Sequence, residues 1–198
     1  MFQKTNEKLI SQAVEILNQG GIVVFPTDTA FGVGCRLDKP KAIQRLFKAR
    51  NRPKNQATPV LVDSVLMVQN YLLPLKPKVE SLMKKYWPGA LTIICPCQIK
   101  RVPSLVRGGG RTLGVRIPHH QVPLQLIKLT GVPLLGPSAN FHGRPTPYQS
   151  KELDQDFLKL VDLVIPGKCQ TGLASTVVDC SKEPWQVIRQ GTIIISRI

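Results

Sequence analysis

The residues best suited to chemistry in this sequence are arginines and hydroxyl side chains gathered in short segments with glycine or proline. Segments of this composition occupy positions 26–32, 50–53, 108–116, 137–147 and 174–176. Hydroxyl and backbone N–H groups donate to phosphate and carboxylate oxygens, and an arginine can hold such a group through two parallel hydrogen bonds. Any one segment alone is typical of an ordinary turn. Together they favour a pocket for anions.

The familiar short signatures of catalytic sites are missing. Gly167-Lys168 is followed by Cys169 and lacks the upstream glycine of a phosphate-binding P-loop. No Gly-x-Gly-x-x-Gly follows a strand-like run, and Cys95 and Cys97 have no second pair with which to complete a zinc site. We therefore expect no metal site built by the protein. A dispersed Ser/His/Asp site stays open, although no Gly-x-Ser-x-Gly supports it.

The net charge of this 198-residue chain is +15, because 27 Lys and Arg face only 12 Asp and Glu. The charge is uneven: no acidic residue lies between Glu80 and Glu152, and Asp38 is the one acidic residue within the basic segment 36–54. Acid-free tracts favour a surface that meets polyanions, such as nucleic acid or a nucleotide triphosphate. No basic amphipathic helix with an aromatic face appears, so we expect no membrane partner. A solvated basic face without a ligand is the alternative.

Composition and termini indicate a globular protein of the cytoplasm. Apolar residues make up 42% of the chain and charged residues 20%, which excludes a disordered or collagen-like protein. No apolar run approaches the roughly 20 residues that span a bilayer. The N-terminal segment has no apolar core of a signal peptide, and the five cysteines are odd in number. We expect reduced thiols in the cytosol.

The elements that must position these segments alternate between helices and strands. Helices are predicted, from apolar spacing, caps and prolines, over 5–19 (with Thr5 or Asn6 as N-cap), 40–49, 64–72, 77–87, 122–129 and 150–159. Strands are predicted over 22–25, 31–37, 59–62, 91–95, 112–117, 132–135, 161–165, 175–180, 186–189 and 192–196. This alternation predicts an α/β fold with a hairpin-like β end, in a single domain over 1–198. The polar segments fall where strands end, which is where open α/β sheets bind ligands.

Six short motifs, in order along the chain, carry a resemblance to a known family. They are FPTDTAFGVG at 25–34, KARNRP at 48–53, WPGALT at 87–92, GVRIP at 114–118, PSAN at 137–140 and STV at 175–177. In these motifs the chain resembles the YrdC-like family, the threonylcarbamoyl-AMP synthases, over nearly its whole length. The resemblance implies a twisted open mixed α/β sheet with helices packed around it and a basic groove, in the short, single-domain form.

The resemblance also implies an activity, that of an L-threonylcarbamoyladenylate synthase, a nucleotidyltransferase. Such an enzyme condenses L-threonine, bicarbonate and ATP, with Mg²⁺ accompanying ATP, and releases pyrophosphate. Its product, threonylcarbamoyl-AMP, serves tRNA threonylcarbamoyladenosine modification through a downstream tRNA threonylcarbamoyl transferase complex. The alternative is an RNA-binding or nucleotide-binding paralogue without synthase activity, acting in RNA or ribosome maturation. In either case tRNA or double-stranded RNA is a further candidate partner for the basic surface.

Residue roles are implied by the same motifs. Threonine contacts are expected from Thr29, Arg116 and Ser175. ATP contacts are expected from Arg52, Thr58, Thr112, Ser138, Thr146 and Arg189, and catalytic roles from Arg50, Arg52, Ser138 and Asn140. The chain departs from the family pattern at two of its positions. Arg50 stands where the family usually has lysine, and Asp63 stands where some members have histidine.

Overall fold

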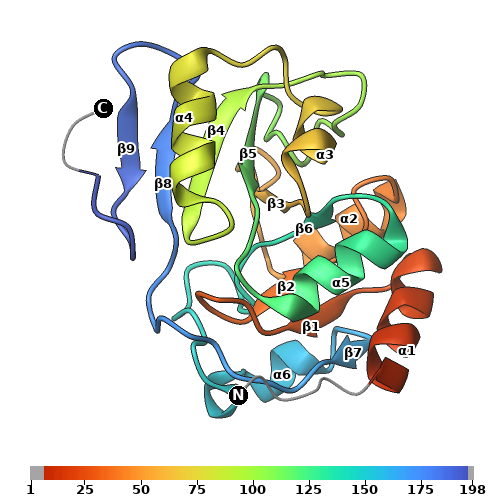
Figure 1. The fold of residues 1–198 in the computed structure, drawn as a ribbon. Coiled ribbons are helices and arrows are strands. Elements are labelled where there is room, and N and C mark those ends of the chain that lie inside the picture. The colour runs from red at the N-terminus through yellow and green to blue at the C-terminus, as the bar shows by residue number, and fades with distance from the viewer. Residues whose placement is uncertain (1–6, 196–198) are drawn as a thin grey trace.

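Two β-sheets and six α-helices make up the described part of the chain (Figure 1). The structure, a computed structural model, describes residues 7–195, so the expected N-cap residues Thr5 and Asn6 lie outside it. The predicted α/β class is confirmed, with parallel and antiparallel strand pairs in both sheets. No helix within residues 7–195 is long and apolar enough to cross a membrane.

The smaller sheet has three strands in the order β2 (Gly32–Gly34), β1 (Val23–Phe25), β7 (Leu163–Val164). Strand β1 is antiparallel to β2 and parallel to β7. All three residues of β1 are buried: Val23 and Phe25 pack against helix α1 (Glu7–Asn18) and helix α5 (Gln121–Thr130), and Val24 packs into the main core on the other side. The buried residues of α1 recur at helical spacing, which is why the apolar pattern predicted the helix.

The larger sheet has six strands, and most of the predicted polar segments follow or precede them. Its order is β6 (Leu134–Leu135), β3 (Val60–Leu61), β5 (Thr112–Arg116), β4 (Leu91–Pro96), β8 (Thr176–Asp179), β9 (Gln186–Arg189). Helix α4 (Pro77–Tyr86) lies over β4 and β8, and α3 (Val65–Gln69) follows β3 (Figure 1). Strands β8 and β9 form the predicted β hairpin at the end of the chain.

The two sheets meet where β2 runs beside β6. The N–H of Leu135 donates to the carbonyl of Cys35 at 2.9 Å, and the N–H of Val33 donates to Pro137 at 2.9 Å. Gly34 is required at this seam, because a Cβ there would lie 2.6 Å from the carbonyl oxygen of Leu135. The seam brings the turn between β1 and β2 next to the loop that follows β6.

Helix α2 (Pro40–Ala49) occupies the predicted range and begins at its proline. Its apolar face is buried in the core, so the orientation of the helix is fixed by packing. The helix ends at Arg50, and Asn51 continues in the left-handed region with a φ of 51°. This sharp exit places Arg50 and Arg52 at one end of the helix, where they face the seam.

Two predicted elements near the C-terminus differ from the structure. The predicted helix 150–159 is wrong as one element: a 3-10 turn at Ser150–Glu152 stops at Leu153, and α6 (Gln155–Leu158) starts afresh. The cause is Asp154, whose carboxylate accepts from the N–H groups of two residues of α6 and caps a new helix. The predicted strand 192–196 is also wrong for its described residues 192–195, which form a bend at 192–193 followed by irregular chain. Ile193 and Ile195 pack on the core instead of pairing in a ladder, whereas Ile194 is exposed.

The contact between α6 and the loop after β6 yields a stability prediction. Phe157 is fully buried and meets Phe141 edge to face, with ring centroids 5.4 Å apart. We expect Phe157→Ala to lower the free energy of unfolding by about 3–5 kcal/mol, because it leaves a cavity. Urea denaturation measures this loss. Leu160→Ala, which truncates a side chain 41% exposed, is the control and should change it by less than about 1 kcal/mol. Equal losses in the two variants would contradict the packing described.

Candidate active site

A polar cavity with about 750 Å³ of open space is lined by residues of both sheets and the loops between them. The lining residues are Thr27, Thr29, Ala30, Phe31, Gly32, Arg50, Arg52, Pro59, Leu61, Thr92, Arg116, Gly136, Pro137, Ser138, Thr146, Ala174, Ser175 and Arg189. No histidine, cysteine or lysine is among these described residues, so arginines and hydroxyls are the polar side chains of the cavity.

The charge of the lining is cationic. Four of its residues are arginines, and Arg116 alone among them has a carboxylate partner, Asp28, within residues 7–195. In that same part of the chain, Arg50, Arg52 and Arg189 form no ion pair. A buried guanidinium without a counter-ion is unfavourable unless a ligand or dipole compensates it. The cavity is therefore built to receive anions.

The turn between β1 and β2 forms one wall of the cavity, and the hydroxyl of Thr27 holds this turn together. Its hydroxyl oxygen accepts from the N–H groups of Thr29 and Ala30 at 3.1 and 3.2 Å and donates to the carbonyl of Ala30 at 2.7 Å. These bonds hold a sharp turn in which all of the polar side chains are nearly buried. The turn thereby directs Thr29 toward the cavity.

Arg116, at the end of β5, anchors the same wall. Its Nη1 donates to the hydroxyl of Thr29 at 2.8 Å, and its Nη2 donates to the carboxylate of Asp28. Burial lowers the pKa of Arg116, while the neighbouring Asp28 carboxylate opposes that shift. The side chain is only 6% exposed, and its Nε is buried without a hydrogen-bond partner. The guanidinium is thus fixed in place by two residues of one turn.

A hydroxyl pair stands opposite, supplied by two neighbouring parallel strands. The hydroxyls of Thr92, on β4, and Ser175, just before β8, are 2.9 Å apart. Arg189, on β9, donates through Nη2 to the Ser175 hydroxyl at 3.0 Å and through Nε to its carbonyl at 3.0 Å. Because the Ser175 oxygen accepts from an arginine, its own proton is left for Thr92 or for a ligand.

The other end of the cavity is organised around Asn140. Arg50 donates through Nε to the Asn140 carbonyl and through Nη2 to its side-chain oxygen, both at 3.0 Å. The hydroxyl of Ser138 donates to the same Asn140 oxygen at 2.7 Å. Burial, and then the charge of Arg52, lower the pKa of Arg50 to about 10. Its Nη1 is buried without a partner, so the guanidinium keeps unused N–H donors.

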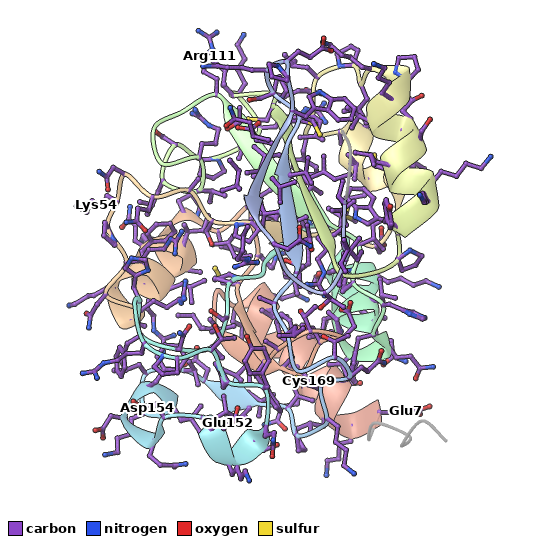
Figure 2. All side chains as sticks on the ribbon, turned by 90° about the vertical axis from the view of Figure 1, so that its left-hand side faces the viewer. Glu7, Lys54, Arg111, Glu152, Asp154 and Cys169 are labelled. Carbon is purple, nitrogen blue, oxygen red and sulfur yellow. The ribbon has the colours of Figure 1, made fainter. Side chains whose placement is uncertain are left out.

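Arg52 lines the cavity and also forms hydrogen bonds within its own loop. Its Nε donates to the carbonyl of Gln56 at 3.2 Å, and its Nη2 donates to the carbonyl of Ala57. Burial lowers its pKa. Its neighbour Lys54 projects outward from this loop at the left of the view, whereas Arg111 lies at the top and Glu152 and Asp154 lie at the bottom (Figure 2).

Most of the residues expected from sequence line this one cavity. They are Thr29, Arg50, Arg52, Arg116, Ser138, Thr146, Ser175 and Arg189. Asn140 lies immediately behind the lining and holds Arg50. Thr58 is buried, with an unpartnered hydroxyl, and its N–H donates to Val106 at 2.9 Å.

Thr112 and Asp63 are placed elsewhere. Thr112 lines a separate hollow beside Arg111, because it begins the strand that Arg116 ends. Four residues of extended chain separate the two positions by about 13 Å. Thr112 is thus absent from the described lining of the cavity, and its expected contact with ATP stays a prediction. Asp63 accepts from the hydroxyl of Ser64 at 2.7 Å and is absent from the described lining.

Sequence reasoning did not assign roles to Asp28 and Thr92. Asp28 belongs to the first motif, and Thr92 ends the third, so both lay within the quoted signals. Their importance arises only in three dimensions, where Asp28 pairs with a strand 88 positions away and Thr92 with a serine 83 positions away.

The buried ion pair generates a prediction. Asp28→Asn keeps the shape of the side chain but leaves the Arg116 guanidinium buried without its counter-ion. We expect the free energy of unfolding at neutral pH to fall by about 3–5 kcal/mol, as measured by urea denaturation. Asp38→Asn is the matched control, because it breaks an ion pair whose aspartate side chain is 46% exposed; it should cost less than about 1 kcal/mol. A small loss in both variants would show that Asp28 does not balance Arg116.

Comparison with known sequences gives consistent matches over most of the chain. The family Sua5_yciO_yrdC, described as "Telomere recombination", matches residues 15–191. A threonylcarbamoyl-AMP synthase of Bacillus subtilis is 32% identical over 195 residues, which is 98% of this chain and 56% of that protein. The chain spans about half the length of this relative and of a similar synthase from Pyrococcus abyssi.

Solved structures agree with the sequence matches. The crystal structure of P. abyssi Sua5 complexed with L-threonine is 32% identical, with a TM-score of 0.89, over 94% of this chain and 55% of that chain. The crystal structure of E. coli YciO is 28% identical, with a TM-score of 0.87, over 96% of this chain and 93% of that chain. Because the family match covers most of its length, the chain belongs to the Sua5/YciO/YrdC family.

Proposed function

We propose that this protein is a threonylcarbamoyl-AMP synthase that condenses L-threonine, bicarbonate and ATP. The observation that carries the proposal is the cavity, which presents two separately held groups of arginines and hydroxyls to one space. Such a cavity suits a reaction that joins two anionic substrates. The names of the relatives support this activity over that of a nucleotide-binding or RNA-binding protein without turnover.

Threonine is proposed to bind at the end formed by Arg116, Thr29 and Ser175. The carboxylate would take the remaining N–H donors of Arg116, whose position Asp28 and Thr29 fix. The hydroxyls of Ser175 and Thr92 are close enough to contact the polar groups of the same small molecule. A crystallised relative bound to L-threonine supports this assignment.

ATP is proposed to bind toward the end formed by Arg50 and Arg52. Their guanidinium groups have no carboxylate partner among the described residues, so phosphate oxygens would supply the missing charge. Ser138 and Thr146 add hydroxyl donors at this end, while Arg189 bridges toward Ser175. Arg50, with its planar fork, replaces the usual lysine of the family, and Asn140 fixes the plane of that fork.

The reaction follows from holding the two substrates together. The threonine amine attacks the carbon of bicarbonate and water leaves, which forms a carbamate. A carbamate oxygen then attacks the α-phosphorus of ATP, the bond to the β-phosphate oxygen breaks, and pyrophosphate leaves. The arginines orient the reactants and stabilise charge on the phosphates, so no enzyme nucleophile is needed. That requirement fits a lining of arginines and hydroxyls.

Mg²⁺ enters this proposal as part of the nucleotide substrate. The ion keeps several waters and is held largely by phosphate oxygens. Within residues 7–195 no three His, Cys, Asp or Glu side chains gather into a metal site, and Asp28 is engaged by Arg116. This set of donors fits a metal carried by the phosphates. In this proposal the enzyme acts in the cytoplasm and its product passes to a tRNA threonylcarbamoyl transferase complex.

The direct test of this function is pyrophosphate release that depends on both threonine and bicarbonate, measured with radiolabelled ATP. We expect the wild-type protein to release pyrophosphate only with all three substrates. Arg52→Ala should lower this rate roughly 100-fold, because a donor to charged phosphate is lost. Lys54→Ala, in the same loop but pointing outward, should keep the wild-type rate. Near-normal turnover in Arg52→Ala would remove this loop from the ATP site.

The threonine end is tested with a variant that keeps the charge. Arg116→Lys retains a cation for Asp28 but cannot offer two parallel hydrogen bonds to a carboxylate. Calorimetry should show threonine affinity lowered about 10-fold or more. Arg111→Lys, the same exchange at an exposed position, should leave it unchanged. Unchanged threonine binding in Arg116→Lys would assign the carboxylate to another residue.

A further inference from the structure

His142 lies beside the two arginines of the phosphate end, although it belongs to none of the motifs quoted for the family. Its N–H donates to the carbonyl of Arg50 at 2.7 Å, so its backbone is tied to the end of α2. Its ring Nδ1 lies 3.5 Å from Nη1 of Arg52. The imidazole is therefore held next to a guanidinium by a contact that is too long for a strong hydrogen bond.

The arginine nitrogen atoms around this contact have N–H donors that lack a good hydrogen-bond acceptor among the described residues. Arg52 uses Nε and Nη2 to hold its own loop, and among residues 7–195 its Nη1 has only the long contact to His142. Arg50 is 4% exposed and lines the cavity, and its Nη1 is buried without any partner. An anion at this end would meet N–H donors that the protein itself leaves unsatisfied.

The electrostatic surroundings of His142 point the same way. Burial, then the charges of Arg52 and Arg50, lower its pKa, and no carboxylate is among the groups that act on it. The free protein therefore favours a neutral ring at neutral pH. An anion that neutralised the two arginines would remove the repulsion and raise the pKa of His142.

We propose that protonated His142 is a third ligand of the phosphate group that Arg50 and Arg52 face, donating Nδ1–H to an oxygen that Arg52 also contacts. The inference rests on the proposed function, because it assigns this end of the cavity to the terminal phosphates of a nucleoside triphosphate and to pyrophosphate. Binding of the polyphosphate then takes up a proton, and its departure releases one. By linkage, protonation of His142 tightens polyphosphate binding by the same factor by which bound polyphosphate raises the proton affinity of His142. Acidification through the pKa of His142 should therefore strengthen polyphosphate binding.

The first test is calorimetry with inorganic pyrophosphate at pH 6 and pH 8. Pyrophosphate changes its own charge over this range, so each variant is compared with the wild type at both pH values. We expect the gain in affinity on going to pH 6 to be about 5-fold larger in the wild type than in His142→Gln. His119→Gln, which changes an exposed histidine just before helix α5, should follow the wild type. AMP, which lacks the terminal phosphates, should give the same pH dependence in all three proteins.

The second test follows His142 directly in the wild-type protein, so it does not depend on the folding of a variant. The ring Cε1–H resonance is titrated by NMR with and without pyrophosphate. We expect the pKa of His142 to rise on binding, while that of His119 stays unchanged. No rise, or an identical pH dependence of affinity in wild type and His142→Gln, overturns the inference.

These outcomes separate the inference from the proposed function. If His142→Gln has the pH dependence of the wild type while threonine-dependent pyrophosphate release is intact, the role of His142 is wrong and the synthase activity stands. If pyrophosphate binds with the His142-dependent profile but no threonine-dependent release occurs, the phosphate site stands and the synthase activity is wrong.

Discussion

Burial of guanidinium groups with too few carboxylates to balance them is the constraint on which this site depends. The charge of Arg116 is balanced by the carboxylate of Asp28. Arg50 has no such partner in the described chain and relies on neutral oxygens of Asn140 and Ser138, which leaves one nitrogen unsatisfied. The depressed pKa of Arg50, about 10, expresses the unfavourable burial of its charge. An anionic ligand would balance the buried charge of Arg50. The buried guanidinium therefore destabilises the empty cavity but strengthens the binding of an anion.

The seam between the sheets is what lets the fold maintain this arrangement. The carbonyl of Phe31, in the β1–β2 turn, accepts from the N–H of Ala139 at 2.8 Å, and the N–H of Phe31 donates to Pro147 at 2.9 Å. The loop that holds Arg50 through Asn140 is therefore bonded to the turn that holds Arg116 through Asp28. Both ends of the cavity are therefore positioned by one network of backbone and side-chain hydrogen bonds, which in the proposed function would keep the two reactants at a fixed separation.

The fold class, the run of helices and strands, and most residues of the cavity could be predicted from the sequence. Helix α2 was predictable to the residue because a proline opens it and a regular apolar stripe fills it. The break in the helix predicted over 150–159 was not, because Asp154 is compatible with both a helix interior and an N-cap until its contacts are seen. The distance between Thr112 and Arg116 could not be predicted, because residues a few positions apart in sequence lie far apart when they are on an extended strand. Asp28 was missed as a partner because the long-range pair it forms leaves no local pattern.

The two ends of the cavity differ in charge, and that difference matches the proposed substrates. At the Arg116 end, Asp28 cancels that guanidinium, and Arg189, which donates to Ser175, is the one cation left without a carboxylate among the described residues. This end can therefore orient a carboxylate through geometry with a single uncompensated charge. The Arg50 and Arg52 end carries two uncompensated cations within residues 7–195, which suits a group with several negative charges. A single small carboxylate at the second end would leave positive charge buried, whereas a polyphosphate would balance it. Charge balance thus supports the proposed assignment of threonine to the Arg116 end and of the nucleotide to the Arg50 and Arg52 end.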